Sequence, residues 1–205
     1  MQPAQNSTLQ RILSAAAEEF SRKGFRSASL RSIAAGAGVT TGAFYGYFKS
    51  KEQLCDALVG EQYQHLLDLY YEILHGFTAL TPQQQQTGME DQSISAVNRM
   101  TDYIYDNLPA FQLILTCSQG TRYEHLVHDM AMLDVEATHN FAKTMVSSGV
   151  PIRPVEEKVE HMLTSGMFSA YFEIVIHGIP RQEADKYIGT LLEFYSAGWQ
   201  KIMGF

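Results

Sequence analysis

The segment from Ala28 to Lys51 constrains the fold more than any other part of the chain, because it reads as two short helices joined by a glycine turn. Ser29 is a good N-cap for the first helix and Thr40 for the second, since each hydroxyl can accept a hydrogen bond from an amide at the helix start. Gly36 and Gly38 lie between them, and glycine lets the chain turn with a positive φ. This pattern predicts a helix-turn-helix, whose second helix enters the DNA major groove.

The rest of the 205-residue chain is predicted to be helical as well. Strand signals are sparse, and most segments show the 3.6-residue period of an amphipathic helix. Further helices are expected at about residues 7–23, 51–75, 91–107, 109–117, 122–148, 155–176 and 181–203, with a polar loop at 81–88. The prediction is an all-α chain of about nine helices. Residues 1–50 would form a three-helix DNA-binding domain, and residues 51–205 a larger helical domain for effector binding and dimerisation.

The charge is distributed unevenly along the chain. The overall net charge of −7 argues against a nucleic-acid partner. However, residues 1–54 hold seven basic and three acidic side chains, a net +4, whereas the remainder holds eight basic and nineteen acidic ones, a net −11. This asymmetry predicts a basic module that meets phosphate and an acidic body that does not.

Three features favour the cytoplasm as the compartment. Two cysteines, Cys55 and Cys117, are typical of a reduced environment and offer no disulfide framework. No apolar stretch follows a basic start, as it would in a signal peptide. No apolar run approaches the roughly 20 residues that a membrane-spanning helix needs, so no membrane partner is expected.

The N-terminal quarter of the chain resembles a known family. The residues that carry the resemblance are Ala15-Ala16, Phe20, Gly24-Phe25, Ser29 to Ala34 and Ala37 to Leu54. The last run is the most specific, since it joins a glycine-valine turn, a threonine cap, an aromatic run and a Lys-x-Lys-Glu helix start. Residues 8–54 resemble the TetR (tetracycline-repressor-like) family of bacterial one-component regulators. The resemblance implies about nine helices, a ligand pocket in the body, and a dimer through the last two long helices.

The DNA contacts are predicted from positions in the motif. Thr41, Gly42 and Ala43 would face base edges at the start of the second helix, where threonine can bond a base and glycine permits close approach. Arg31, on the preceding helix, is expected to reach either a guanine or a phosphate. Ser29 can donate to phosphate as well as cap its helix.

The remaining predicted contacts are to phosphates. Thr40 can donate to phosphate in addition to capping. Tyr45 is expected to donate to a phosphate and Tyr47 to reach the other flank, unless one of the two rings belongs to the core. Lys51 starts the next helix, where backbone amides and the helix dipole also favour an anion.

The body is predicted to bind a small molecule and a second copy of the chain. Its many aromatic and methionine side chains suit a small, largely apolar or aromatic effector. The pocket residues are predicted to include Tyr103, Phe111, His128, Met167 and Tyr171. Helices at about 155–176 and 181–203 are apolar over more than one face. They therefore need a second partner, which is either another helix of the same chain or the same helices of a second copy in a homodimer.

Other function classes have less support in the sequence. His125 and His128 are three residues apart beside Asp129, a spacing that can hold a metal, but no third ligand at fixed spacing joins them. Nothing basic flanks Cys55 or Cys117 as a redox switch would require. No phosphate loop, nucleophile elbow or zinc-binding histidine motif points to an enzyme, and no cofactor or metal is expected. The prediction is a homodimeric transcriptional repressor that binds a palindromic double-stranded DNA operator and is released by its effector. The alternatives are a ligand-independent regulator controlled by a protein partner and a metal or redox sensor.

Overall fold

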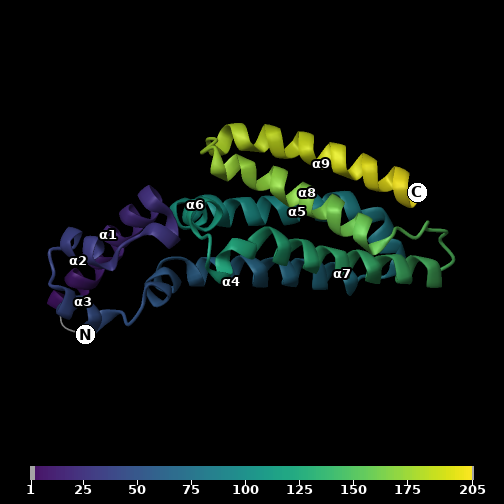
Figure 1. Cartoon of the computed structure of the whole chain (residues 1–205). Helices are drawn as coiled ribbons and strands as arrows, with labels where there is room; N and C mark the ends of the chain where they lie inside the picture. Colours follow the sequence, from purple (N-terminus) through teal and green to yellow (C-terminus); the bar gives the residue numbers. More distant parts are fainter. Residues whose placement is uncertain (1–2, 205) are drawn as a thin grey trace. The chain divides into compact units, whose positions relative to one another are not determined.

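A computed structural model describes residues 3–204, which form nine α-helices and one short 3₁₀-helix (Figure 1). The elements are α1 (Pro3–Ser27), α2 (Leu30–Gly36), α3 (Thr41–Tyr47), α4 (Lys51–Thr78), α5 (Pro82–Asp106), α6 (Leu108–Cys117), η1 (Arg122–His125), α7 (Leu126–Ser147), α8 (Glu157–Ile176) and α9 (Arg181–Met203). These residues contain no strand, so the predicted all-α class is confirmed. None of their helices is both long enough and apolar enough to cross a membrane.

The helices group into two compact units. The first contains the chain up to residue 64 together with residues 107–126, and the second contains residues 65–106 and the chain from 127 onward. The long helix α4 therefore runs from one unit into the other. These units are defined by which helices pack together. The predicted division near residue 50 separates a DNA-binding domain from an effector-binding domain by function, and it stays a prediction.

The first unit is built on α1, against which α2 and α6 pack, while α3 packs against α2. Ile12, Ala16 and Phe20 form the buried stripe of α1, as its helical period predicts. Gly24 breaks the helical run with φ 71°, in agreement with the predicted stop, although Phe25 to Ser27 return to helical geometry. The second unit has its own core, and α9 packs there against both α8 and α5. Figure 1 shows α8 and α9 side by side.

The predicted polar loop at 81–88 is wrong, because these residues form the first turns of α5 from Pro82 onward. The Thr81 hydroxyl accepts a hydrogen bond from the amide of Gln84 (3.3 Å), so Thr81 is the N-cap of α5. Proline at the first helical position and glutamines after it both favour a helix. Gln85 is 1% exposed and donates to the carbonyls of Thr78 (3.1 Å) and Leu80 (3.0 Å), which terminates α4.

Candidate nucleic-acid interface

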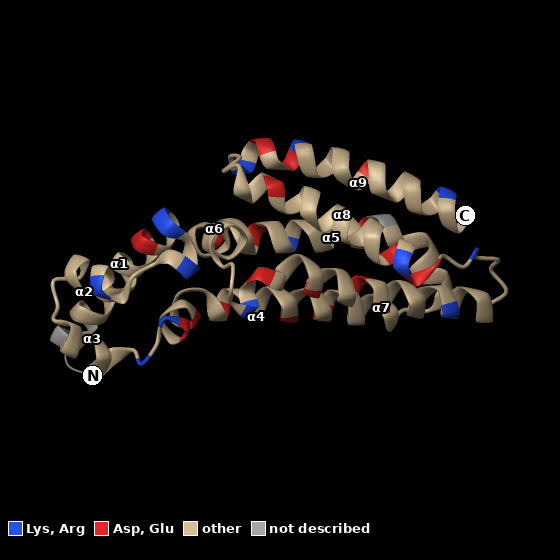
Figure 2. Cartoon of the chain, in the orientation of Figure 1, with Lys and Arg blue, Asp and Glu red and all other residues tan. Residues whose placement is uncertain are grey.

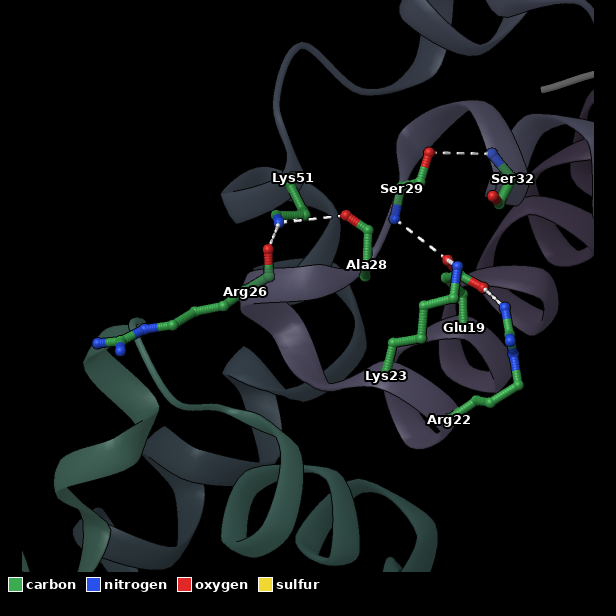
Figure 3. Close-up of polar contacts among 8 residues, drawn as sticks. All are labelled: Glu19, Arg22, Lys23, Arg26, Ala28, Ser29, Ser32 and Lys51. Atoms are coloured by element: carbon green, nitrogen blue, oxygen red, sulfur yellow. Dashed lines mark hydrogen bonds and ion pairs between the residues drawn. The ribbon is translucent and has the colours of Figure 1, made fainter.

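The start of α2 is held by a small polar cluster beneath it (Figure 3). Ser29 caps the helix, since its hydroxyl accepts a hydrogen bond from the amide of Ser32 (3.4 Å). The amide of Ser29 in turn donates to the carboxylate of Glu19 (3.2 Å), which lies on α1. The same carboxylate pairs with Arg22 (2.6 Å) and Lys23 (2.8 Å). Lys23 and Arg22 together lower the pKa of Glu19 from 4.5 to about 2, and the Ser29 amide adds to this shift.

The turn between α2 and α3 has the predicted glycine geometry. Gly38 adopts φ 65°, a conformation that side chains with a Cβ rarely take. Its amide donates to the carbonyl of Ala35 (3.0 Å), and the amide of Val39 donates to that of Ala34 (3.0 Å). The turn therefore pairs carbonyls that α2 would otherwise leave unsatisfied at its end.

Helix α3 starts at a threonine cap and presents its first turn outward. The Thr40 hydroxyl accepts from the amide of Ala43 (3.1 Å), and Phe44 is completely buried. Thr41, Gly42 and Ala43 are all exposed. The start of α3 is thus open to a partner, while the opposite face anchors the helix in the core.

The other predicted contact residues surround this exposed turn. Arg31 is exposed on α2, and the Tyr45 side chain is 44% exposed. Tyr47 is half-buried, so neither tyrosine belongs to the buried core. Figure 2 shows lysines and arginines on α1 and α2, in agreement with the basic composition of this part of the chain. The DNA contacts themselves remain predictions.

Lys51 has a structural role that its position in the motif does not reveal. Its amine donates to the carbonyls of Arg26 (2.9 Å) and Ala28 (3.3 Å), as Figure 3 shows. It also lies over the ring of Phe25, 4.7 Å from the ring centre. Lys51 therefore ties the start of α4 to the end of α1. A phosphate contact, which remains a prediction, would have to use the remaining hydrogen of the same amine.

Comparison with known proteins agrees with this geometry. Residues 12–58 match the family model for bacterial regulatory proteins of the tetR family, and the matched range contains α2, the turn, α3 and the start of α4. The matched segment therefore has the sequence of a TetR-type DNA-binding domain. The HTH-type transcriptional repressor KstR2 of Mycolicibacterium smegmatis is 27% identical over 202 residues, which cover 86% of this chain and 92% of that protein. The HTH-type transcriptional regulator UidR of Escherichia coli is 37% identical over 76 residues, but the match spans 39% of its length.

Solved structures extend the likeness in fold to most of the chain. SCO3833, a TetR-family member from Streptomyces coelicolor, superimposes with a TM-score of 0.57 at 19% identity, and the match covers 90% of this chain and 88% of that one. FadR from Bacillus subtilis, solved in complex with stearoyl-CoA, gives a TM-score of 0.53 at 14% identity, with 91% and 96% covered. At these identities the likeness shows the shared fold.

The predicted effector residues fall in both compact units. Four of them, Tyr103, His128, Met167 and Tyr171, lie in the second unit, whereas Phe111 is fully buried in the first. Tyr171 is 8% exposed, and its hydroxyl lies 2.9 Å from that of Thr101. The Tyr103 ring packs against that of His65 in a tilted arrangement, with 4.3 Å between ring centres, and Nδ1 of the exposed His128 lies 3.3 Å from Nε2 of His161. Met167 is half-buried. Their role in effector binding stays a prediction.

The second unit also contains a polar network that sequence reasoning missed. The Tyr70 hydroxyl donates to Asp134, and the Thr164 hydroxyl lies 3.4 Å from the other oxygen of that carboxylate. Burial raises the pKa of Asp134, while the two hydroxyls oppose the shift. Nearby, Glu160 is 3% exposed and pairs with His139. The available signal was an acidic residue at core spacing on α7, four residues after the buried Met130.

Neither proposed sensor chemistry gains support from the described residues. Burial, with the neighbouring Asp56 and Glu52, raises the pKa of Cys55 to about 11, so little of the reactive thiolate exists at neutral pH. His125 pairs with Glu124 (3.5 Å). Within residues 3–204, no group of three or more His, Cys, Asp or Glu is arranged to hold a metal.

Proposed function

We propose that the chain is a TetR-family transcriptional repressor that binds a palindromic operator as a homodimer and leaves it when a small, largely apolar or aromatic effector binds the second unit. The observation that carries the proposal is the exposed first turn of α3, held on a buried anchor at Phe44 and capped by Thr40. A helix end presented in this way fits the major groove. Relatives that are named transcriptional repressors support the sign of regulation.

Few side chains at this surface can read bases. Thr41 and Arg31 carry suitable donors, whereas Gly42 and Ala43 can offer only close approach and an apolar contact. Specificity would therefore rest partly on the spacing of two half-sites and on DNA shape, with the two heads of a dimer in successive major grooves.

The homodimer would form through α8 and α9. Large apolar side chains are exposed on both helices: Val159, Met162 and Ile176 on α8, and Tyr187, Phe194 and Ile202 on α9. Met162 and Phe194 are 71% and 70% exposed, which is unusual for such residues unless a partner covers them. Figure 2 shows charges gathered at the N-terminal end of α9 and few along the rest of it.

The effector would be accommodated by the interior of the second unit. That interior is rich in aromatic rings: Tyr70 packs edge-to-face on Phe168, with 5.5 Å between ring centres, and Phe168 stacks on Phe172 at 6.4 Å. Such surroundings suit a ligand with a large apolar part. The structural relative FadR was solved with stearoyl-CoA, a ligand of that kind.

Selection from a pool of random DNA duplexes tests the proposal. The wild-type chain should enrich a palindrome whose half-sites are about one helical turn apart. A library of apolar and aromatic compounds, screened by melting shift, should then yield a compound that raises the melting temperature and releases the enriched duplex. Enrichment of no sequence would reject the DNA-binding part, and a compound that stabilises the protein but leaves the duplex bound would reject the release mechanism.

A further inference from the structure

The DNA-binding unit is discontinuous in sequence. Residues 107–126 pack with the N-terminal helices, and α6 lies directly against α1. At its two ends this segment continues into α5 and α7, which belong to the second unit. Residues 107–126 therefore link the effector-binding part covalently to the body of the DNA-binding unit.

A group of side chains joins this segment to the first half of α4. Tyr123 is 3% exposed, and its hydroxyl donates to Oδ1 of Asp56. Arg122 donates to the same oxygen (2.9 Å) and to the Tyr123 hydroxyl (3.1 Å). The Tyr123 ring also packs edge-to-face on Tyr63, with 5.1 Å between ring centres. We call Asp56, Arg122 and Tyr123 the α4 clasp.

The α4 clasp packs closely against Gly60, in the space that a side chain at this position would occupy. A Cβ atom at this position would lie 2.9 Å from the Tyr123 hydroxyl oxygen and 3.1 Å from Oδ1 of Asp56. Both atoms are the far ends of side chains, so an added methyl group is accommodated by opening the clasp rather than by moving backbone. Glycine inside a helix is less favourable than alanine, and the clasp explains why it stands here.

The clasp acts on the same short stretch of α4 that leads out of the helix-turn-helix. Lys51 fixes the start of α4 to α1, and Asp56 lies five residues further along the helix. Burial and the Asp56 hydrogen bond raise the pKa of Tyr123 to about 12, so its hydroxyl keeps the donated proton at physiological pH.

We propose that Asp56 and Tyr123 are positioning residues for DNA binding: the closed clasp holds α4, and through Lys51 the helix-turn-helix, in the arrangement that binds the operator, and opening it lowers operator affinity. This inference rests on the proposed function, since it concerns the regulation of the same DNA-binding surface. Residues 107–126 would thereby contribute to DNA binding without contacting the DNA.

Two glycine variants in the same helix provide the first test. Gly60→Ala should weaken binding to the enriched duplex at least tenfold in fluorescence anisotropy, with wild-type helicity by circular dichroism. Gly76→Ala is the matched control, because nothing lies within 4 Å of a Cβ there. It should raise the melting temperature and leave DNA affinity unchanged. A loss of affinity in both variants would show a general effect of alanine on α4 and overturn the proposal.

A second pair removes hydroxyl groups alone. Tyr123→Phe should also weaken binding to the enriched duplex at least tenfold at a temperature where the variant is fully folded. Its control is Tyr105→Phe, whose hydroxyl donates to the carbonyl of Ile179 (2.6 Å) in the second unit, and which should bind as wild type. If Gly60→Ala does not fold, the comparison of Tyr123→Phe with Tyr105→Phe tests the clasp instead. Wild-type affinity in folded Tyr123→Phe overturns the clasp, whereas failure of the wild type to enrich any duplex overturns the proposed function instead.

Discussion

At the scale of single residues, the carboxylate of Glu19 holds the beginning of the helix-turn-helix in place. It accepts hydrogen bonds from the Ser29 amide and from two basic side chains of its own helix, Arg22 and Lys23. These contacts stabilise the ionised form and place the pKa of Glu19 at about 2. The arrangement therefore depends on a charged carboxylate.

Replacing this carboxylate should remove a pH-dependent part of the stability. Because the pKa of Glu19 is lowered in the folded chain, its contribution is complete above about pH 4.5 and is lost as the pH falls towards about 2. Glu19→Gln should melt at a lower temperature than wild type at pH 7, and the difference should shrink through this window. Glu18→Gln is the control, since Glu18 is exposed. A constant difference between pH 7 and pH 2.5 would contradict this.

Thr41 should influence which operator is preferred. Thr41→Ala removes a hydroxyl at the exposed start of α3, and a lost hydrogen bond to a base costs about 1 kcal/mol, or roughly fivefold in affinity. Competition between the enriched duplex and its single-base variants should show a changed ranking for this variant. Equal losses on enriched and scrambled DNA would disprove a role in base recognition.

Tyr45 should contribute to affinity without affecting sequence preference. If its hydroxyl donates to a phosphate, Tyr45→Phe costs about 1.5 kcal/mol, roughly tenfold, on every duplex, because bonds to charged groups are the stronger ones. Anisotropy titrations with enriched and scrambled duplexes measure this. An effect confined to the enriched duplex would instead indicate base contact.

The local residue roles of the helix-turn-helix followed from the sequence, because caps and glycine turns depend on neighbours within four residues. Ser29, Gly38 and Thr40 have the predicted local conformations and caps. Lys51 was incompletely understood because its partners are 23 and 25 residues away, at the end of another helix. For the same reason the bond between Asp56 and Tyr123, 67 residues apart, has no local sequence signal.

At the scale of elements, α5 shows that a glutamine run need not be a loop. The polar composition of residues 81–88 suggested a loop, yet Gln85 is buried and terminates α4. Gln85→Ala would leave the carbonyls of Thr78 and Leu80 without this partner, at a cost of about 1–3 kcal/mol. The melting temperature should fall by about 2–4 °C per kcal/mol. Gln86→Ala, at an exposed position, should change it little, and equal effects of the two substitutions would refute the capping role.

At the scale of the whole molecule, the proposed dimer requires a partner copy that covers α8 and α9. The helix bounds at 181–203 were predicted from the sequence, whereas the extent of the uncovered surface required the structure. The two helices contact each other along the chain, and that contact still leaves Met162 and Phe194 exposed. Each of the two helices therefore has a partner within the chain, and its exposed face remains available to a second copy of the chain.

A charge on this face should separate the subunits. Phe194→Asp would bury an unpaired carboxylate in the proposed interface, at a cost of at least about 3 kcal/mol per chain. Light scattering after gel filtration should show a monomer, or a dimer dissociating at a concentration far above the wild type's. Tyr71→Asp, at an exposed aromatic residue on α4, should remain dimeric. A dimeric Phe194→Asp would place the interface elsewhere.

Native mass spectrometry of the purified chain with its enriched duplex tests whether the chain binds its operator as an effector-responsive dimer. We expect a complex of one duplex with two chains, or with a multiple of two, and a dimer of the same chains when DNA is omitted. An added effector should shift the signal from this complex to free duplex and ligand-bound dimer. A complex containing a single chain, or protein and duplex that never associate, would contradict the proposed dimeric repressor.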